Sequence, residues 1–459
     1  LRLPDKRQRP ILLLIMNPAA PLRIAIIGAG WAGMAAAVHA ADAGHQVTVF
    51  EAARQLGGRA RGVPLSLPDG REVMVDNGQH ILIGAYAECL RLMRRVGVDP
   101  AQALLRRPLA LTYPDGSGLV LPDWPAPADA LAGILRARGW SWRDKRALLG
   151  AALGWRRRGF VCDERISVGA LCAGLPPRLR QEFIEPLCVS ALNTPMAEAS
   201  AQVFLRVLRD ALFAERGGSN LLLPRVDLSA LFPQAAARWI EARGGHVLAG
   251  QRVESLTWQA PHWQVGDQAF DRVLLATSAP HAVQIAVQTA QAAPRSIADQ
   301  LHAWAHGAAA LKHRAITTVY AQAEAGGART LLRAPMLALR SGPGAPAQFV
   351  FERDAITRPG QATRLLAFVV SASEGDRGAL EAAITQQAQA QLGLRVTPLL
   401  TVTEKRATFA CTPALARPPL AVAPGLLACG DYVEGPYPAT LEGAVRSGLL
   451  AVEAMEALR

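Results

Sequence analysis

The chain has 459 residues, of which 51% are hydrophobic and 19% are charged. This balance excludes a disordered protein, and the length predicts two or three domains with a large core. The net charge of +12 comes almost entirely from arginine, which fits an anionic partner such as phospholipid, but equally a genome rich in arginine and alanine codons. Since no nucleic-acid-binding motif occurs, nucleic acid is not predicted as a partner.

Residues 1–21 precede the first expected strand, and we expect them to be disordered or an artefact of the assigned start. Met16 stands just ahead of a proline-rich lead-in and is interpreted as the true start. The alternative is a signal peptide, but its apolar run is too short and a small-residue cleavage site is missing. No apolar stretch elsewhere in the sequence is long enough to span a bilayer. We therefore expect a cytoplasmic protein.

Residues 22–61 carry the clearest motif in the chain. An apolar run is followed by Gly28, Gly30 and Gly33 at the spacing G-x-G-x-x-G, then by an alanine-rich helical pattern and a second apolar run that ends on Glu51. Strand, glycine turn, helix, strand and acid form the context that the dinucleotide-binding fingerprint requires. We therefore expect a nucleotide on this turn.

Each residue type in this motif has a physical role. Gly28 permits the tight turn, Gly30 lets a pyrophosphate approach the backbone, and Gly33 lets the helix pack closely on the strand. The first turn of the helix offers free N–H groups to the phosphates. Glu51 is placed to accept hydrogen bonds from the adenosine ribose and disfavours a 2′-phosphate. The nucleotide is therefore FAD or NAD rather than NADP.

The segment after the acid separates FAD from NAD. Gly57, Gly58, Arg59 and Arg61 add backbone donors and cations near the same phosphates. On the residues alone this indicates only stronger anion binding, and the alternative for the two arginines is a solvated turn. The sequence G-G-R-A at this place resembles the flavin amine oxidase and phytoene desaturase superfamily, whose members hold FAD.

A polar cluster, Asp76-Asn77-Gly78-Gln79-His80, follows a predicted hairpin. One interpretation is a strand-to-helix corner, in which Asp76 or Asn77 caps the helix and His80 is satisfied in the core. The other is a loop beside the flavin, with His80 or Asp76 facing the substrate. Both interpretations stay open at the level of sequence.

Residues 108–214 lack glycine motifs and are mainly helical in pattern. Within them, residues 133–160 interleave Trp140, Trp142 and Trp155 with eight basic side chains. A basic, tryptophan-rich helix pair lying on the inner face of an anionic membrane is one interpretation. A solvated helical face over core tryptophans is supported equally.

Residues 246–256 predict a strand after a helix over 228–242. This strand resembles the segment that covers the adenine in the superfamily, and the resemblance implies that the Val253 backbone bonds the adenine edge. Residues 286–413 predict a sheet covered by helices, with strands over 315–321, 348–352 and 364–370. Together with residues 108–214 they are expected to form the substrate-binding domain.

The C-terminal passage repeats the pattern of the first motif. A strand ends in Gly430-Asp431, and the last helix opens near Thr440, so its N–H groups point at an anion. The passage resembles the second FAD motif of the superfamily, which implies that Asp431 accepts bonds from ribityl hydroxyls and that Gly443 keeps the helix close to the flavin ring. The FAD-binding domain is therefore expected to combine residues 22–107, 215–285 and 414–459.

The chain resembles the hydroxysqualene dehydroxylases from residue 22 to the C-terminus. The segments that indicate this family are residues 76–86 and 432–448, whereas the glycine motifs indicate only the superfamily. The resemblance implies an α/β fold, in which a discontinuous Rossmann-like domain carries an inserted mixed α+β substrate domain. It also implies FAD, a long-chain isoprenoid substrate, and reductive removal of an allylic hydroxyl from hydroxysqualene to give squalene. An acid must protonate that hydroxyl, and the candidates by motif position are Asp76, His80, Glu434 and Tyr437.

Two other classes of function stay open. Carotenoid desaturases, amine oxidases and protoporphyrinogen oxidases share this scaffold, and the GDP-dissociation inhibitors use it to hold prenyl chains without catalysis. The electron donor, a reduced nicotinamide or a redox protein, is undetermined. The six cysteines show neither disulfide nor metal-ligand spacing, so no metal is predicted. The residues expected to hold FAD are Gly28, Gly30, Trp31, Ala32, Gly33, Glu51, Gly57, Gly58, Arg59, Val253, Gly430, Asp431, Thr440, Leu441 and Gly443.

Overall fold

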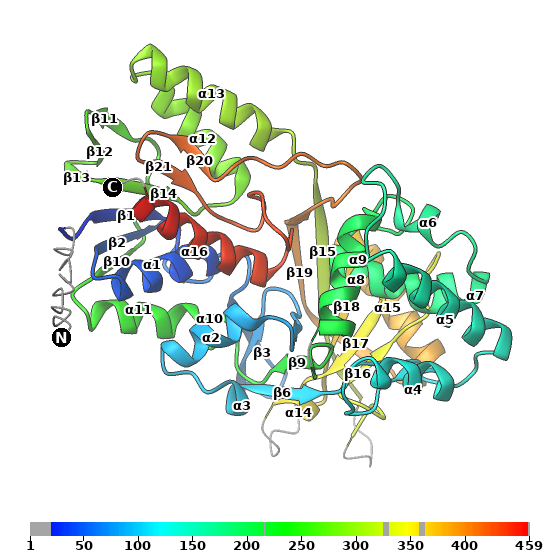
Figure 1. Cartoon of the computed structure of the whole chain (residues 1–459). Helices are drawn as coiled ribbons and strands as arrows, with labels where there is room; N and C mark the ends of the chain where they lie inside the picture. The colour runs from blue at the N-terminus through cyan, green and yellow to red at the C-terminus, as the bar shows by residue number, and fades with distance from the viewer. Residues whose placement is uncertain (1–19, 215, 325–329, 358–362, 458–459) are drawn as a thin grey trace, which may run out of the picture.

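A parallel sheet and an antiparallel sheet form the two halves of the molecule (Figure 1). The computed structural model describes residues 20–214, 216–324, 330–357 and 363–457. All but the last two residues of the expected N-terminal extension, 1–21, lie outside this description. Within the described ranges, no helix combines the length and the apolar character needed to cross a membrane.

The parallel sheet carries the glycine motifs and has the strand order β10-β2-β1-β14-β21-β20. Its first five strands are parallel, and only β20 runs antiparallel to its neighbour. Both faces are covered by other elements, which explains why its strands are continuous apolar runs. The strands are β1 (Arg23–Ile27), β2 (Gln46–Glu51), β10 (His246–Ala249), β14 (Arg272–Leu275), β20 (Ala421–Ala423) and β21 (Leu426–Ala428).

Helices α1 (Trp31–Asp42) and α16 (Leu441–Ala457) pack against each other beside this sheet (Figure 1). A Cβ at Gly448 would lie 2.4 Å from the Ala32 carbonyl oxygen, so glycine is what allows the close crossing. The two helices follow the first and the last glycine motif. Their contact therefore brings chain segments some 400 residues apart to one site.

The antiparallel sheet has the order β16-β17-β18-β15-β19. Its strands are β15 (His313–Ala323), β16 (Met336–Ala338), β17 (Phe349–Glu352), β18 (Leu365–Ser373) and β19 (Val396–Phe409). Helix α15 (Arg377–Leu392) packs its buried Leu380, Ile384 and Ala388 with one face of the sheet. The expected strands over 315–321, 348–352 and 364–370 are confirmed, whereas the long strand β19 was not predicted.

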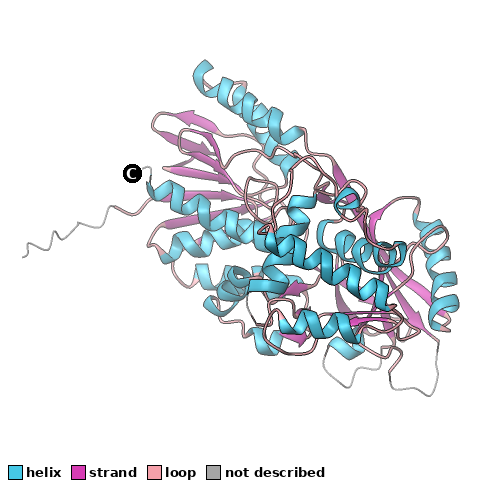
Figure 2. Cartoon of the chain, turned by 45° about the vertical axis from the view of Figure 1, so that its right-hand side comes forward, coloured by secondary structure: helices cyan, strands magenta, loops and turns pink. Residues whose placement is uncertain are grey.

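Figure 2 shows helices around the strands throughout the molecule. One group of helices lies beside the antiparallel sheet, at the end remote from the parallel sheet (Figure 1). They are α4 (Ala128–Arg136), α5 (Trp142–Arg157), α6 (Val168–Leu171), α7 (Pro177–Leu179), α8 (Glu185–Leu192) and α9 (Ala201–Arg209), with the π-helices η1 (Arg180–Ile184) and η2 (Asp210–Ala214). The expected helix pair in residues 133–160 is thus present as α4 and α5, separated by a capping box at Ser141 and Asp144.

Smaller elements connect the two halves. Strand β9 (Leu221–Pro224) pairs with β5 (Leu82–Ile83) and β6 (Leu104–Arg107). These hydrogen bonds connect the segment around residue 222 to the segment of residues 82–107. The remaining elements are β3 (Gly62–Ser66), β4 (Glu72–Asp76), α2 (Ala87–Arg95), α3 (Pro100–Ala103), β7 (Ala110–Thr112), β8 (Gly118–Val120), α10 (Leu228–Leu231), α11 (Pro233–Glu241), β11 (Thr257–Gln259), β12 (His262–Val265), β13 (Gln268–Phe270), α12 (Ala279–Ala290), α13 (Arg295–Ala309) and α14 (Arg353–Ile356).

Three sequence-based boundaries need correction. The helix expected over 228–242 is split at Phe232, because Pro233 begins a new helix. The strand expected over 246–256 ends at Ala249, since Gly250 turns the backbone with a φ of 78°. The domain boundary expected at residue 286 falls within α12, and the next helix, α13, contacts β20 of the parallel sheet.

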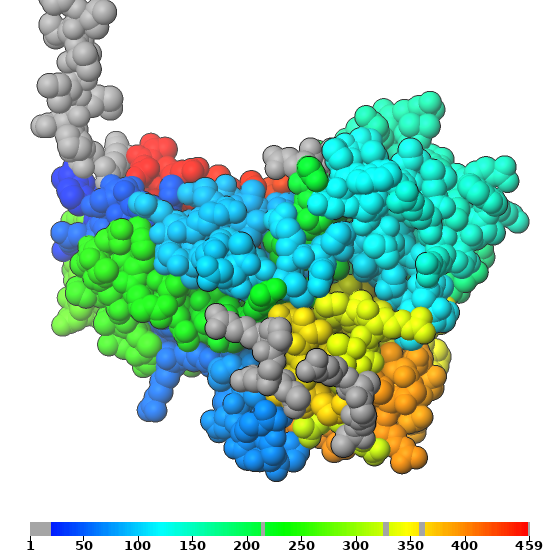
Figure 3. Space-filling view, turned by 90° about the horizontal axis from the view of Figure 1, so that it is seen from below, coloured from blue at the N-terminus to red at the C-terminus, as the bar shows by residue number. Residues whose placement is uncertain are grey.

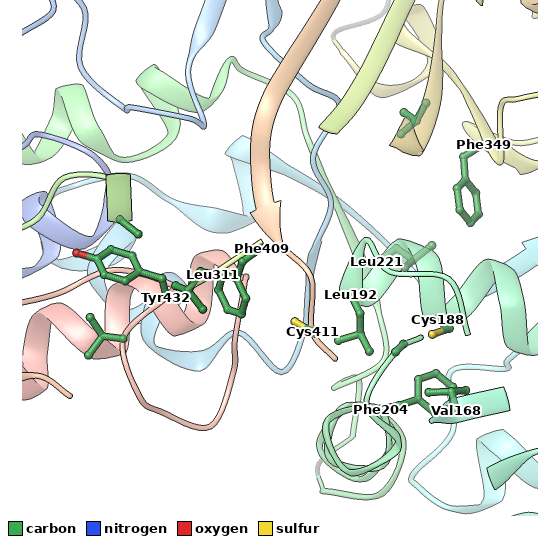
Figure 4. Packing of buried hydrophobic residues seen from close by; sticks show 14 of the residues in the cluster. Val168, Cys188, Leu192, Phe204, Leu221, Leu311, Phe349, Phe409, Cys411 and Tyr432 are labelled. Carbon is green, nitrogen blue, oxygen red and sulfur yellow. The ribbon is translucent and has the colours of Figure 1, made fainter. Parts of the chain in front are cut away.

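One continuous apolar core joins the two halves (Figure 4). Tyr432 and Leu311 pack near the parallel sheet, Phe409 ends β19, and Leu192 ends α8, all within the same buried cluster. Because this core is shared, the halves form one body with a fixed cavity between them rather than two loosely linked domains.

Candidate active site

A cavity of about 1060 Å³ runs between the two halves. One end is lined by both glycine motifs, and the other by apolar side chains of the substrate-binding half. A cavity of this kind, apolar with a few convergent polar groups, is the usual form of a small-molecule site.

The first glycine turn lies at the nucleotide end of the cavity and behaves as its spacing predicts. Gly28 has a φ of 114°, which only glycine adopts readily. A Cβ on Gly33 would lie 2.0 Å from the Gly28 carbonyl oxygen, so this glycine packs the helix onto the turn. A Cβ on Gly30 would meet nothing within 4 Å, because Gly30 faces the cavity. Trp31 and Ala32, in the first turn of α1, also line the cavity.

The second glycine pair lies directly against the first turn. Gly57 forms a parallel bridge with Gly30, and its N–H donates to the Ala29 carbonyl oxygen at 3.0 Å. Gly57 and Gly58 both have positive φ, 113° and 60°. The two turns together present a cavity wall of bare backbone.

Glu51 is held at the edge of this wall. Its Oε2 accepts a hydrogen bond from Ala29 N at 2.7 Å, and its Oε1 accepts one from Ala53 N at 2.8 Å. Gln251 N donates to the Glu51 carbonyl oxygen at 2.8 Å, which places the neighbouring Val253 on the same stretch of cavity wall. Val253 belongs to an irregular segment, not to the strand expected there.

Arg59 and Asp431 join the two motifs across the cavity. The Arg59 guanidinium donates through Nη2 to Asp431 Oδ1 and through Nη1 to the Ala407 carbonyl oxygen, the latter at 2.6 Å. Burial opposes the charge of Arg59, but the adjacent carboxylate outweighs it, so the pKa of Arg59 is raised. Arg59 is therefore already paired within the chain, and Gly430 beside it also lines the cavity.

The second motif differs from expectation at Gly443. A Cβ at this residue would lie 1.9 Å from the Tyr437 carbonyl oxygen, and Gly443 does not line the large cavity. Its N–H donates to Thr440 Oγ1 at 2.9 Å. Gly443 thus closes the loop against the start of α16, while Thr440 and Leu441 are the residues that face the cavity.

These residues fit FAD. The nucleotide end offers an open position over Gly30, a helix N-terminus and a fixed carboxylate, and Gly430 and Asp431 continue the same wall toward the substrate end. A dinucleotide spanning both motifs needs all of these features on one surface, and the cavity provides them.

Asp76 is removed from the cavity wall. Its side chain is fully buried, and its Oδ1 accepts a hydrogen bond from Leu228 N at 2.8 Å, at the start of α10. Its carbonyl oxygen accepts a bond from the Tyr320 hydroxyl at 2.8 Å. Burial raises the pKa of Asp76 to about 7. The capping interpretation is therefore correct in kind, although the capped helix lies far along the sequence, and a substrate-facing role is not supported.

Glu434 is also misplaced for catalysis. Its side chain is exposed and lies outside the large cavity. The preceding residues, Tyr432 and Val433, are 2% exposed and anchor the loop in the core, which turns Glu434 outward.

His80 lies on the cavity wall. Its Nδ1 lies 2.5 Å from the Gly78 carbonyl oxygen, and because a carbonyl only accepts, Nδ1 carries the hydrogen and Nε2 is an acceptor. Burial lowers the pKa of His80, so the neutral ring is favoured. A neutral imidazole with this tautomer can orient a hydroxyl group but is a poor proton donor.

Tyr437 lines the cavity next to Asp210, an acid that the sequence analysis missed. Asp210 begins the π-helix η2, and its Oδ1 accepts a bond from Arg209 Nε at 2.7 Å. Its buried Oδ2 accepts no hydrogen bond from any described residue. Burial, and then the charge of Asp210, raise the pKa of Tyr437. The only sequence signal was an acid at the end of an amphipathic helix, which does not reveal a π-helix or a cavity.

The remaining wall of the cavity in the substrate-binding half is apolar. The wall is made by side chains from β7 and the residue before it, from η1, α8 and α9, and from the antiparallel sheet, namely Leu109, Leu111, Phe183, Leu187, Val203, Val207, Ile316, Met336, Phe349, Phe351 and Val369. Such a lining suits a long hydrocarbon, with the polar groups His80, Asp210 and Tyr437 set into it.

Comparison with known proteins agrees with this geometry. Residues 31–455 match the family described as flavin containing amine oxidoreductase. The hydroxysqualene dehydroxylase of Rhodopseudomonas palustris is 30% identical over 93% of this chain and 97% of its own length, and that of Zymomonas mobilis is 27% identical over the same shares. The 15-cis-phytoene desaturase of Synechococcus elongatus is 27% identical over 50% of this chain and 49% of its own length.

Among solved structures, a putative protoporphyrinogen oxidase from Exiguobacterium sp. 255-15 superposes with a TM-score of 0.66 at 15% identity, covering 96% of this chain and 100% of that one. At this identity the likeness shows the fold alone, a Rossmann-like FAD domain with an inserted substrate domain. The chain belongs to the flavin containing amine oxidoreductase family and is an FAD-dependent oxidoreductase related along most of its length to the hydroxysqualene dehydroxylases.

Proposed function

We propose that this enzyme removes the allylic hydroxyl of hydroxysqualene reductively and releases squalene. The observation that carries the proposal is the extent of similarity: the hydroxysqualene dehydroxylases match 93% of the chain, including the substrate-binding half, whereas the phytoene desaturase matches half of it. The apolar cavity next to the FAD site supports a long-chain isoprenoid substrate.

The reaction needs a hydride equivalent, which reduced FAD supplies when it is bound, and a proton. The carbon–oxygen bond of the substrate breaks with its electron pair on oxygen, the oxygen takes the proton and leaves as water, and a carbon–hydrogen bond forms at the allylic carbon. Reduced FAD would supply these two electrons when bound, so an external reductant would be needed for the next turnover.

We assign the proton to the pair formed by Tyr437 and Asp210. Burial and the adjacent Asp210 carboxylate raise the pKa of Tyr437 and keep its phenol protonated, so Tyr437 can donate a proton to the leaving hydroxyl and take one back from water. His80, with an acceptor Nε2, orients the hydroxyl.

The test is an anaerobic turnover of the reduced flavoprotein with hydroxysqualene, followed by mass spectrometry of the products and the flavin absorbance. We expect squalene to form in step with flavin oxidation. A protein that holds reduced FAD, is oxidised by air, and yet forms no squalene would contradict the proposed substrate while leaving the FAD assignment intact.

A further inference from the structure

Exposed apolar side chains are concentrated on one helical part of the molecule. Of the eleven large hydrophobic residues that the structure describes as exposed, seven lie between residues 120 and 161. Five of them, which we call the tryptophan face, are Trp124, Leu131, Leu135, Trp142 and Leu153, with 45%, 49%, 40%, 66% and 47% exposure.

These side chains form one surface, because basic residues bridge them. The Arg136 guanidinium lies over the Trp124 ring at 5.1 Å, and the Lys145 ammonium lies over the Trp142 ring at 5.1 Å. Lys145 Nζ also donates to the Leu135 carbonyl oxygen at 2.8 Å. The loop at Trp124, helix α4 and helix α5 are therefore held together at this face.

The tryptophan face does not contribute to the core. On α5, Trp142 and Leu153 point outward with Arg146 and Arg157, whereas Trp155 on the opposite side is 5% exposed. The spacing of 142, 146, 153 and 157 places these residues on one side of the helix. Both interpretations of residues 133–160 hold in part: Trp140 and Trp155 are core residues, and Trp142 is not.

The charge around the face is positive. Residues 118–161 contain eight basic and three acidic residues. Two of these acids, Asp129 and Asp144, are only 4% and 7% exposed, and Asp144 is engaged in the capping box of α5. The third acid, Asp123, is exposed beside Trp124 and lies 3.6 Å from Arg216 Nη2. The solvent therefore meets tryptophan and leucine among mainly basic side chains, the composition that binds an anionic lipid interface.

The face lies close to the apolar end of the cavity. The ring of Trp140, between α4 and α5, contacts the ring of Phe183 at 5.4 Å, and Phe183 lines the cavity. Both helices lie at the end of the molecule remote from the parallel sheet (Figure 1), and from below their cyan region forms one end of the surface (Figure 3).

We propose that the tryptophan face docks on an anionic phospholipid bilayer, with the indole rings and leucines at the headgroup–acyl boundary and the arginines on lipid phosphates. This orientation places the apolar end of the cavity toward the membrane and the FAD end away from it. The proposal concerns a binding surface and does not depend on the reaction proposed above.

The test is co-sedimentation of the FAD-loaded protein with vesicles of phosphatidylglycerol and phosphatidylcholine, compared with vesicles of phosphatidylcholine alone. We expect binding to the anionic vesicles that weakens with salt. Trp124→Ser with Trp142→Ser, and separately Arg146→Glu with Arg157→Glu, should each lower the binding by on the order of tenfold. The matched control is Met74→Ser with Val287→Ser, which removes exposed apolar side chains elsewhere and should change nothing.

Retained FAD absorbance and an unchanged thermal midpoint show that each variant is folded. Equal binding to both kinds of vesicle, or variants that bind as the unaltered protein does, would overturn the proposal. Light scattering in solution tests whether the tryptophan face instead binds a second copy of the chain. A dimer that the tryptophan substitutions convert to a monomer would identify the face as a contact between copies and would also overturn the proposal.

Discussion

At the FAD end of the cavity the wall is backbone, supplied by two glycine turns and the start of α1, and its few side chains are fixed by hydrogen bonds to that backbone. At the other end the wall is side chains, supplied by five or more separate elements. The shape of the wall at the FAD end depends on which residues are glycines and so lack a Cβ. The shape of the wall at the substrate end depends on which side chains fill the space.

This difference decides how each end responds to change. In the glycine turns, Gly33 and Gly57 tolerate no added atom, because a Cβ at either residue would lie within 3 Å of a backbone oxygen. A side-chain wall of Leu, Val, Met and Phe can be altered one residue at a time, with other residues compensating. Cofactor identity is thus tightly constrained on this scaffold, and substrate identity much less so.

The largest expected effect comes from Gly33→Ala. The new Cβ would lie 2.0 Å from the Gly28 carbonyl oxygen and 3.0 Å from the Ala276 Cβ, so α1 must move away from the turn. We expect loss of bound FAD and a fall of about 3 kcal/mol or more in the free energy of unfolding of the apoprotein. Flavin absorbance after purification and urea unfolding measure the two effects, and a variant that keeps its FAD contradicts this account of the turn.

The same difference explains which parts were predictable from sequence. The motifs around Gly28, Gly57 and Gly430 are local in sequence, so the spacing at Gly28 and the family resemblance at Gly57 and Gly430 predicted residues that line this end of the cavity. Gly443 was expected to keep α16 close to the flavin ring, and the structure adds that a Cβ there would lie 1.9 Å from the Tyr437 carbonyl oxygen. The spacing indicated a glycine at this position, but it did not indicate which neighbouring atom excludes a Cβ there.

The substrate end was less predictable, because tertiary contacts define it. Nothing near Asp210 in the sequence indicates that it meets Tyr437, more than 200 residues away. Asp76 and Glu434 lie in motifs that resemble the family, yet one caps a remote helix and the other faces solvent. Strand β19 was missed because its charged centre, at Glu404 to Arg406, hides the apolar alternation.

A second prediction tests whether Asp76 is structural. Its folded pKa, raised by burial to about 7, exceeds the ordinary value near 4. The folded state therefore binds more protons between these values, and stability should fall as pH rises from about 4 to 7 and stay low above. Asp76→Asn keeps the acceptor for Leu228 N and removes the charge, so it should be more stable than the unaltered protein at pH 8, on the order of 3 kcal/mol, with little difference at pH 4. Thermal unfolding across this range measures the difference, and a constant offset would show that Asp76 does not titrate as described.

The third prediction concerns the proton-donating pair. Tyr437→Phe and Asp210→Asn should each lower the rate of hydroxysqualene reduction roughly hundredfold, because the first removes the proton donor and the second removes the carboxylate that acts on it. FAD binding should be unchanged, since neither residue lies at the nucleotide end. Glu434→Gln, on the exposed side of the same loop, is the matched control and should retain full activity. Rates of flavin oxidation under anaerobic conditions measure the effect, and near-normal turnover in both variants would remove the pair from the mechanism.

The smallest expected effect distinguishes two roles of glycine in this turn, which are close packing of the helix at Gly33 and open space for the pyrophosphate at Gly30. Gly30→Ala adds the same methyl group as Gly33→Ala, but at a position where no described atom lies within 4 Å. The apoprotein should therefore unfold within about 0.5 kcal/mol of the unaltered protein. The methyl group would project into the space that the pyrophosphate needs, so the dissociation constant for FAD should rise about tenfold, equivalent to about 1.4 kcal/mol. Titration of apoprotein with FAD measures this change. An unchanged dissociation constant would mean that the pyrophosphate does not lie over Gly30 but at another part of the cavity wall.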